Sequence, residues 1–315
     1  MSIIWCTACQ DAHEESECPI QKVTAAIEAV NTQANASIAS VVDTMLARPD
    51  LHFSAKGEQL LTEAKCVAED REPCLWTGAS GFGKTEIAKE IVRQLGYPCL
   101  AQTNAYPMMD ISLWVGQWQP ATENGSLTVK WHDGVLSSCI RNGIPFMLEE
   151  ITRAPQDAMA RFFSVLDDMD RSYSIPEHGG EEVAVHPDFW FLATANPPGG
   201  AYATVKLDKA LLSRFSAIWE VNEPLADEIT LLKLRLSDPR FDGMAERLMA
   251  FVTDARRSPT TYVNTRDLMQ CAKRIAQGFG TMRSVELSII PKYDNPDLIK
   301  CAELHLSDAN PDEVA

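Results

Sequence analysis

The 315-residue sequence lacks any run of 18 or more apolar residues, which excludes an ordinary membrane-spanning helix. Its start, Met1 to Cys6, also lacks the basic residues and the long apolar stretch of a signal peptide. We therefore expect a cytoplasmic protein with no membrane contact. In that compartment its nine cysteines are interpreted mainly as reduced thiols, most of them small core residues.

Positive charge is also scarce. The chain has 28 Lys and Arg against 44 Asp and Glu, a formal net charge of −16. General nucleic-acid binding depends on Lys and Arg that neutralise phosphates, so the composition argues against nucleic acid as a partner. Composition alone does not exclude a local basic channel. The acidic balance fits solubility and protein partners without identifying them.

Residues 1–20 form a polar, Cys-containing N-terminal segment. Its candidate zinc ligands are Cys6, Cys9, His13 and Cys18, because thiolate and imidazole groups at short spacing suit tetrahedral Zn²⁺. A second Cys pair at the spacing of a zinc ribbon is missing. The sequence is therefore compatible both with a zinc site and with a terminal segment that binds no metal.

The most specific pattern is the phosphate-binding loop G-A-S-G-F-G-K-T at residues 78–85. It follows an apolar run and precedes a stretch in which Ile87, Ile91 and Leu95 share one helical stripe. Backbone N–H groups of such a loop bind phosphates at the N-terminus of the next helix. We expect ATP to contact Gly78, Ala79, Ser80, Gly81, Phe82, Gly83, Lys84, Thr85 and Glu86. Lys84 would reach the β and γ phosphates, and the Thr85 hydroxyl would ligate Mg²⁺.

Short apolar runs alternate with helical stretches through the middle of the chain. The runs are Cys74–Thr77, Cys99–Gln102, Pro145–Leu148, Phe189–Thr194 and Ala217–Val221. Continuous apolar strands separated by helices predict an α/β fold, with a parallel sheet covered by helices on both faces. Later segments show only helical patterns, which are Leu225–Leu236, Met244–Arg256 and Thr265–Gln277.

These patterns divide the chain into five parts. They are the Cys-containing segment 1–20, N-terminal helices at 21–70, a nucleotide-binding α/β domain at 71–222, a small helical domain at 223–283 and an acidic C-terminal tail at 284–315. The N-terminal helices are predicted from Val23 to Met45 and from Leu51 to Glu69. One helix near Pro296–Leu306 is the only pattern in the tail.

Two carboxylates follow the apolar strand that ends at Leu148. An apolar strand that ends in two acidic residues is a Walker B pattern. In such a site the first carboxylate, here Glu149, holds Mg²⁺, and the second, Glu150, polarises the attacking water. Glutamate at 149 replaces the usual aspartate, so the carboxylate moves by one methylene group. Octahedral Mg²⁺ tolerates displacement poorly, and we expect slow hydrolysis.

Two further polar residues follow predicted elements. Asn196 ends the strand after Phe189 and is predicted to position the lytic water or the γ-phosphate, although Asn before Pro is also a common turn starter. Arg214 follows a short helical stretch. Taken alone, it is a surface cation near a helix C-terminus.

Four motifs thus follow one another along the chain: the phosphate-binding loop at 78–85, the carboxylates Glu149 and Glu150, the strand end at Asn196 and the helix end at Arg214. In this order they resemble the motifs of an AAA+ ATPase. Within that superfamily the MoxR group, with its CobS, CbbQ and NorQ-like relatives, is similar in the segments Gly83–Glu86, Glu149–Pro155, His186–Phe189 and Ala193–Pro197. The resemblance covers about residues 50–275. It implies a P-loop AAA+ domain followed by a helical lid, and a ring, usually a hexamer, with ATP bound between neighbouring subunits.

The resemblance also implies catalytic roles beyond Glu150 and Asn196. Arg214 would act on the γ-phosphate of the neighbouring subunit, and Arg266 would match sensor 2 at the start of a lid helix. Judged by sequence alone, Arg266 is equally a surface residue at a helix start. Arg153 is a further candidate for contact with the neighbouring site.

Two segments resemble the hairpins inserted in this group, Gln117–Gly134 with its Asn124-Gly125 turn and Arg171–His186. Trp114, Trp118 and Trp131 would then contact a partner or lie in the core, and burial is the favoured alternative.

We therefore predict a homo-oligomeric, ATP-hydrolysing ring motor or chaperone that remodels a partner protein. The resemblance implies a von Willebrand A domain partner and a client such as a metalloenzyme or cofactor-insertion system. A nucleic-acid motor and a nucleotide-gated scaffold with weak hydrolysis are the alternatives.

Overall fold

The computed structural model describes residues 3–6, 11–14, 42–44, 51–123, 126–167, 171–196, 207–258, 261–293 and 295–307. The chain divides into two compact units. We call them the sheet unit (1–47, 61–78 and 85–220) and the helical unit (48–60, 79–84 and 221–315). Helix α3 (Ala55–Glu69) belongs partly to each. Each unit is described separately below.

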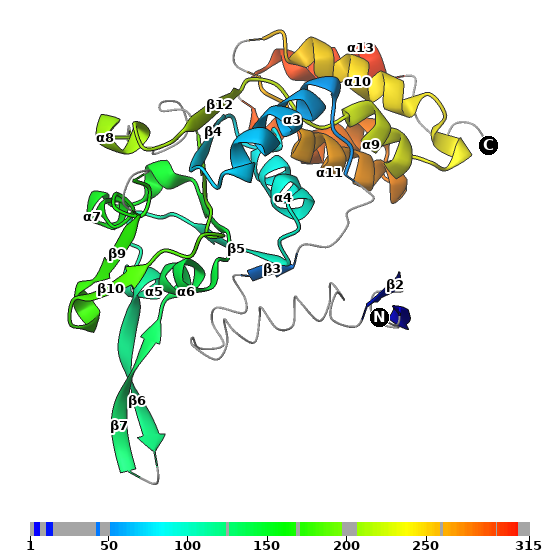
Figure 1. Cartoon of the computed structure of the whole chain (residues 1–315). Helices are drawn as coiled ribbons and strands as arrows, with labels where there is room; N and C mark the ends of the chain where they lie inside the picture. The colour runs from blue at the N-terminus through cyan, green and yellow to red at the C-terminus, as the bar shows by residue number, and fades with distance from the viewer. Residues whose placement is uncertain are drawn as a thin grey trace. The chain divides into compact units, whose positions relative to one another are not determined.

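A six-stranded sheet forms the centre of the sheet unit (Figure 1). Its order is β12 (Ala217–Val221), β4 (Cys74–Gly78), β11 (Phe191–Ala195), β8 (Phe146–Glu149), β5 (Cys99–Asn104) and β3 (Val42–Thr44). Strand β11 pairs in parallel with both β4 and β8, and β8 pairs in parallel with β5. The predicted parallel α/β sheet is therefore confirmed.

Each predicted apolar run overlaps one strand of this sheet. All five residues of β11 are buried, as a central strand covered on both faces requires. The core beside it is aromatic, with ring centroids of Phe162 and Phe191 4.8 Å apart and those of Trp114 and Phe162 5.2 Å apart. The helical segments of this part of the chain are α4 (Lys84–Gln94), α5 (Ser112–Val115), α6 (Val135–Asn142), η2 (Ile151–Arg153), α7 (Gln156–Ala160) and α8 (Lys209–Leu212).

The N-terminal part differs from its prediction. Strands β1 (Ile3–Cys6) and β2 (Asp11–Glu14) form an antiparallel pair. The helix predicted from Val23 to Met45 is wrong at its end, because β3 pairs antiparallel with β5 there, while residues 23–41 lie outside the described residues. The β-branched Val42 and Thr44 suit a strand, and the open edge of β5 supplies the partner.

Two antiparallel hairpins belong to the sheet unit and lie where the two hairpins were predicted. Strands β6 (Gly116–Glu123) and β7 (Ser126–Asp133) form the first, which extends away from α5 and α6 in Figure 1. Strands β9 (Ser172–Ile175) and β10 (Glu181–Ala184), joined through η3 (Pro176–His178), form the second. The Asn124-Gly125 turn lies outside the described residues.

The helical unit is built around one core. Its elements are α9 (Glu228–Arg235), η4 (Pro239–Phe241), α10 (Met244–Ala255), α11 (Thr265–Ala276), α12 (Thr281–Ser288), η5 (Ile290–Lys292) and α13 (Asp297–Leu306). Leu298, Ala302 and Leu306 of α13 share that core with Phe251 and Leu268. The helix predicted near Pro296–Leu306 is present as α13, and the helical part continues past the predicted boundary at residue 283, which lies inside α12. No helix in the described residues is long and apolar enough to cross a membrane.

Candidate nucleotide-binding site

The loop between β4 and α4 curls through residues with positive φ. These are Gly78 (139°), Gly81 (82°) and Gly83 (97°), in a backbone region that residues with a side chain rarely adopt. At Gly81 a Cβ atom would also lie 2.7 Å from the Asn264 side chain within the helical unit. The glycines of the motif are therefore required by backbone geometry and by close packing.

Lys84 lies at the start of α4 with only 7% of its surface exposed. Its Nζ donates a hydrogen bond of 2.8 Å to the Ala79 carbonyl, so the loop's own backbone holds the ammonium group. A positive group beside a loop rich in N–H donors, at a helix N-terminus, suits an anionic ligand.

Thr85 and Glu149 are brought together within the sheet unit. The Thr85 hydroxyl donates to Oε1 of Glu149, and Nε2 of Gln102 donates to Oε2 at 3.0 Å. Hydroxyl and carboxylate oxygens are the hard donors that Mg²⁺ prefers, so this pair fits the predicted ion. Sequence reasoning missed Gln102, whose only signal was a polar side chain near the C-terminal end of an apolar strand.

Glu150 has a left-handed backbone (φ 55°, ψ 43°) directly after β8. Its N–H donates to Oγ1 of Thr194 at 3.2 Å, which ties this turn to β11. Its carboxylate accepts from Nδ2 of Asn196 at 3.4 Å and pairs with Arg153 at 2.5 Å. The structure thus brings Glu150 and Asn196 together, and it pairs Arg153 with Glu150 of its own chain.

The two predicted γ-phosphate arginines lie in different units. Arg214 follows α8, where Nε donates to the Phe163 carbonyl at 3.1 Å and Nη1 to the Ala210 carbonyl at 2.7 Å. Its guanidinium also lies over the Phe163 ring at 4.8 Å. Arg266 is exposed in the first turn of α11. Their action on ATP remains a prediction.

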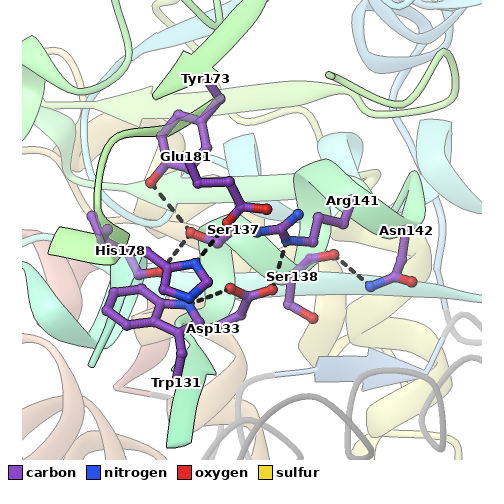
Figure 2. Close-up of polar contacts among 10 residues, drawn as sticks. Trp131, Asp133, Ser137, Ser138, Arg141, Asn142, Tyr173, His178 and Glu181 are labelled. Carbon is purple, nitrogen blue, oxygen red and sulfur yellow. Dashed lines mark hydrogen bonds and ion pairs between the residues drawn. The ribbon is translucent and has the colours of Figure 1, made fainter. Parts of the chain in front are cut away.

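A polar junction joins the two hairpins to α6 (Figure 2). Arg141 on α6 pairs with Asp133 at the end of β7 (2.8 Å) and with Glu181 on β10 (2.5 Å). His178 contacts the same Glu181 oxygen at 2.8 Å, and Nε1 of Trp131 donates to Asp133 at 2.7 Å. Hydrogen bonds from Arg141 and His178 lower the pKa of the Glu181 carboxyl. One guanidinium group therefore fixes both hairpins.

Aromatic rings surround this junction. Trp131 stacks on His178 with centroids 4.6 Å apart, and Nε1 of Trp118 donates to the Glu177 carbonyl at 3.1 Å. Burial, the favoured prediction for the tryptophans, is right for Trp114 at 2% exposure and wrong for Trp118 at 52%. Trp118 is exposed because it lies on a hairpin, away from the main core.

The cysteines divide into three groups, of which the third is the exposed Cys66 and the partly buried Cys301. The side chains of Cys6, Cys9, His13 and Cys18 lie outside the described residues, so zinc binding there remains a prediction. The free thiols of Cys74, Cys99, Cys139 and Cys271 are buried, as predicted for core cysteines. Burial raises the pKa of the Cys74 and Cys271 thiols to about 12 and that of Cys99 to about 11. These thiols are therefore not ionised near neutral pH.

Comparisons with known proteins agree with this fold. The AAA domain (dynein-related subfamily) matches residues 73–215. Protein CbbQ of Hydrogenophilus thermoluteolus is 25% identical over 259 residues, covering 80% of this chain and 92% of CbbQ. Protein NorQ of Paracoccus denitrificans (strain Pd 1222) is 26% identical over 250 residues, 78% of this chain and 89% of NorQ.

Two other matches are more limited. Midasin of Giardia intestinalis is 32% identical over 146 residues, which is 46% of this chain but 3% of the midasin. A crystal structure of NtrX from Brucella abortus has a TM-score of 0.50 at 20% identity, covering 72% of this chain and 52% of NtrX, and shows likeness of fold. Residues 73–215 therefore match an AAA domain, and the chain is similar to CbbQ and NorQ over most of its length and most of theirs.

Proposed function

We propose that the protein binds ATP with Mg²⁺ and hydrolyses it to remodel or activate a partner protein. The observation that carries this proposal is the grouping of Thr85, Glu149, Glu150 and Asn196 in the sheet unit. Three of these residues follow or end parallel strands, and Thr85 directly follows the glycine loop. Side chains at the carboxyl ends of such strands are where α/β folds bind ligands.

Each residue of the proposed site has a separate task. The loop N–H groups and Lys84 bind the phosphates, while Thr85 and Glu149 hold Mg²⁺, which neutralises charge on the phosphate oxygens. Glu150 takes a proton from the attacking water, and Asn196 orients that water. Arg214 of a neighbouring subunit and Arg266 stabilise charge that develops on the γ-phosphate.

The ion pair with Arg153 affects the proposed base. Oε2 of Glu150 is paired with Arg153 and Oε1 accepts from Asn196, so an attacking water must compete with these partners for the carboxylate. The pair therefore supports slow hydrolysis by the protein alone. Glu149 in place of aspartate supports the same expectation.

Substitution of Lys84 tests nucleotide binding and hydrolysis together. Lys84→Met should abolish phosphate release from ATP and weaken the binding of a fluorescent ATP analogue at least about tenfold, since one buried cation contributes a charge-assisted bond to phosphate. Lys56→Met removes an exposed cation of α3 and is the matched control. Equal activity of both variants and the unchanged protein would refute the proposed site.

We further propose that the hairpin β6–β7 contacts the partner. Its exposed apolar side chains are Trp118 (52%), Leu127 (82%) and Val129 (57%). The Arg141 junction holds the base of this hairpin, so the side chains are presented on a fixed support. Likeness to CbbQ and NorQ supports a partner enzyme as the client, with a metalloenzyme and a von Willebrand A domain protein as the finer proposal.

Two substitutions on the hairpin test this contact. A von Willebrand A domain protein encoded beside this gene should raise the ATPase rate, and Leu127→Asp with Val129→Asp should remove that increase while the basal rate persists. Stimulation by DNA, with steep salt dependence, would instead favour the nucleic-acid motor. Tight ATP binding without turnover, even with the partner present, would favour the nucleotide-gated scaffold.

A further inference from the structure

Asp254, Cys301 and His305 form a cluster between α10 and α13 of the helical unit. Oδ2 of Asp254 lies 3.7 Å from Sγ of Cys301 and 3.5 Å from Nε2 of His305. The three potential ligand atoms all lie within 4.8 Å of one another, and each side chain is partly exposed. The cluster contains none of the residues proposed for ATP and none of the cysteines of residues 1–20.

Two of the three separations are close to the edge length of a small coordination tetrahedron. A zinc ion binds sulfur at about 2.3 Å and nitrogen or oxygen at about 2.0–2.1 Å, so neighbouring ligands of tetrahedral zinc lie roughly 3.3–3.5 Å apart. The two measured separations are within a few tenths of an ångström of that range. Asp254 would therefore need only small movements relative to each of the other two side chains to share an ion with them.

The surrounding structure orients all three groups. Cys301 and His305 are one helical turn apart and so lie on the same face of α13. Arg257 pairs with Oδ1 of Asp254 at 2.9 Å, while Oδ2 faces the other two groups. The core contacts of α10 and α13, made by Phe251 and Leu298 among others, fix the separation of the helices. The helix positions that carry the three side chains are therefore fixed by core packing.

We propose that Asp254 Oδ2, Cys301 Sγ and His305 Nε2 bind one Zn²⁺ ion, which joins α13 to α10. A thiolate, an imidazole and a carboxylate together suit zinc, whereas Mg²⁺ and Ca²⁺ prefer oxygen ligands alone. Three protein ligands leave the fourth position to water, and the partial exposure of the cluster gives water access. The site is thus of the open type, and its occupation stabilises the packing of the last helix.

Without metal, these side chains form weak polar contacts. The Cys301 thiol can donate to the Phe251 carbonyl at 3.8 Å or to Asp254. Burial and the nearby Asp254 charge raise the pKa of this thiol, and a bound dication would favour its ionised form instead. A cluster that is only hydrogen-bonded predicts no metal-thiolate signal, so the two states are distinguishable.

Cobalt titration tests the proposal in the full-length chain. Cys6, Cys9 and Cys18 are first replaced by Ser, so that the N-terminal segment supplies no thiolate. Co²⁺ should then produce a thiolate-to-cobalt charge-transfer band and the intense visible bands of four-coordinate cobalt, saturating at one ion per chain. Zn²⁺ should displace the cobalt and raise the midpoint of thermal unfolding.

Two substitutions assign the signal. Cys301→Ser should remove the charge-transfer band, and His305→Gln should weaken cobalt binding at least about tenfold. Cys66→Ser removes an exposed thiol of α3 and should leave the titration unchanged. The proposal fails if the parent shows no charge-transfer band, or if the band survives Cys301→Ser in protein that still unfolds cooperatively.

Discussion

Glu150 has a left-handed backbone conformation, and its carboxylate contacts two side chains. A left-handed conformation in a residue other than glycine stores about 1–3 kcal/mol, and such strain is found mainly where the surrounding structure holds it for a purpose. Here the Thr194 hydroxyl holds the backbone, and Asn196 and Arg153 hold the carboxylate. This geometry supports Glu150, rather than Glu149, as the base.

We expect Glu150→Gln to lower the rate of ATP hydrolysis by about 10²–10⁴-fold, because a carboxamide cannot accept the proton of the attacking water. ATP binding should be retained, since Glu150 makes no predicted contact to the nucleotide in the ground state. Phosphate release and fluorescent-nucleotide binding measure the two effects separately. Glu182→Gln, an exposed position on β10, is the control. Unchanged phosphate release in the Glu150 variant would remove this residue from the catalytic role.

Glu149 has one methylene group more than the usual aspartate, and the structure shows where its carboxylate lies. Its side chain reaches the Thr85 hydroxyl directly, and Gln102 on β5 holds its other oxygen. The longer side chain is thus held at both oxygens, which restricts it to few rotamers. The partner Gln102 comes from a strand 47 residues away in sequence, a contact that no local pattern could predict.

At the scale of elements, the Arg141 junction determines how the two hairpins are held. Arg141→Met should lower the free energy of unfolding by about 2–3 kcal/mol, because it leaves the buried Asp133 carboxylate with one fewer charged partner. Urea denaturation measures this change. The control is Arg283→Met, which breaks an exposed pair with Glu286 and should change the free energy by less than about 1 kcal/mol. Equal effects of the two substitutions would contradict the structural role of Arg141.

The same junction predicts a pH dependence through Glu181. Hydrogen bonds from Arg141 and His178 hold the pKa of its carboxyl below the usual range in the folded state. The associated stability is therefore present at neutral pH, above the unfolded pKa, and is lost as the pH falls through the folded pKa. Glu181→Gln should flatten the acid limb of stability against pH, measured by urea denaturation from neutral pH downward. An unchanged slope of stability against pH would show that the hydrogen bonds to Glu181 contribute nothing to acid unfolding.

Sequence patterns predicted the elements of the main sheet better than those outside it. Strands such as β8 and β11 are continuous apolar runs, and this property is local. Strand β3 was missed because its pairing depends on the distant edge of β5, while its apolar spacing also fits a helix. Helix α13 was predicted near Pro296–Leu306, because the buried Leu298, Ala302 and Leu306 recur every four residues along it.

The sequence predicted those residues of the candidate site that belong to local motifs, and it did not predict their side-chain partners. The loop, Glu150 and Asn196 belong to motifs that each follow one strand, and their proximity follows from neighbouring parallel strands. The partners Gln102 and Thr194, and the pair between Arg153 and Glu150, depend on side-chain directions. A single sequence carries no signal for such directions.

At the scale of the whole molecule, the proposed ring makes Arg214 the residue that links subunits. In the isolated chain its guanidinium group is held by two carbonyls and the Phe163 ring. Carbonyl oxygens neutralise no charge, so a phosphate could compete for this group. In a head-to-tail ring, each subunit would then supply Arg214 to the site of its neighbour.

Mixing two inactive variants tests this arrangement. Glu150→Gln retains Arg214 but lacks the base, and Arg214→Ala retains the base but lacks the arginine. If Arg214 acts on the neighbouring site, some sites of a mixed ring combine an intact base with an intact arginine, and random mixing restores roughly a quarter of the unchanged protein's activity. Light scattering with ATP present verifies that both variants assemble. Assembled mixtures that remain inactive would place Arg214 outside the neighbour's site, because mixed rings contain sites that combine an intact base with an intact neighbouring arginine.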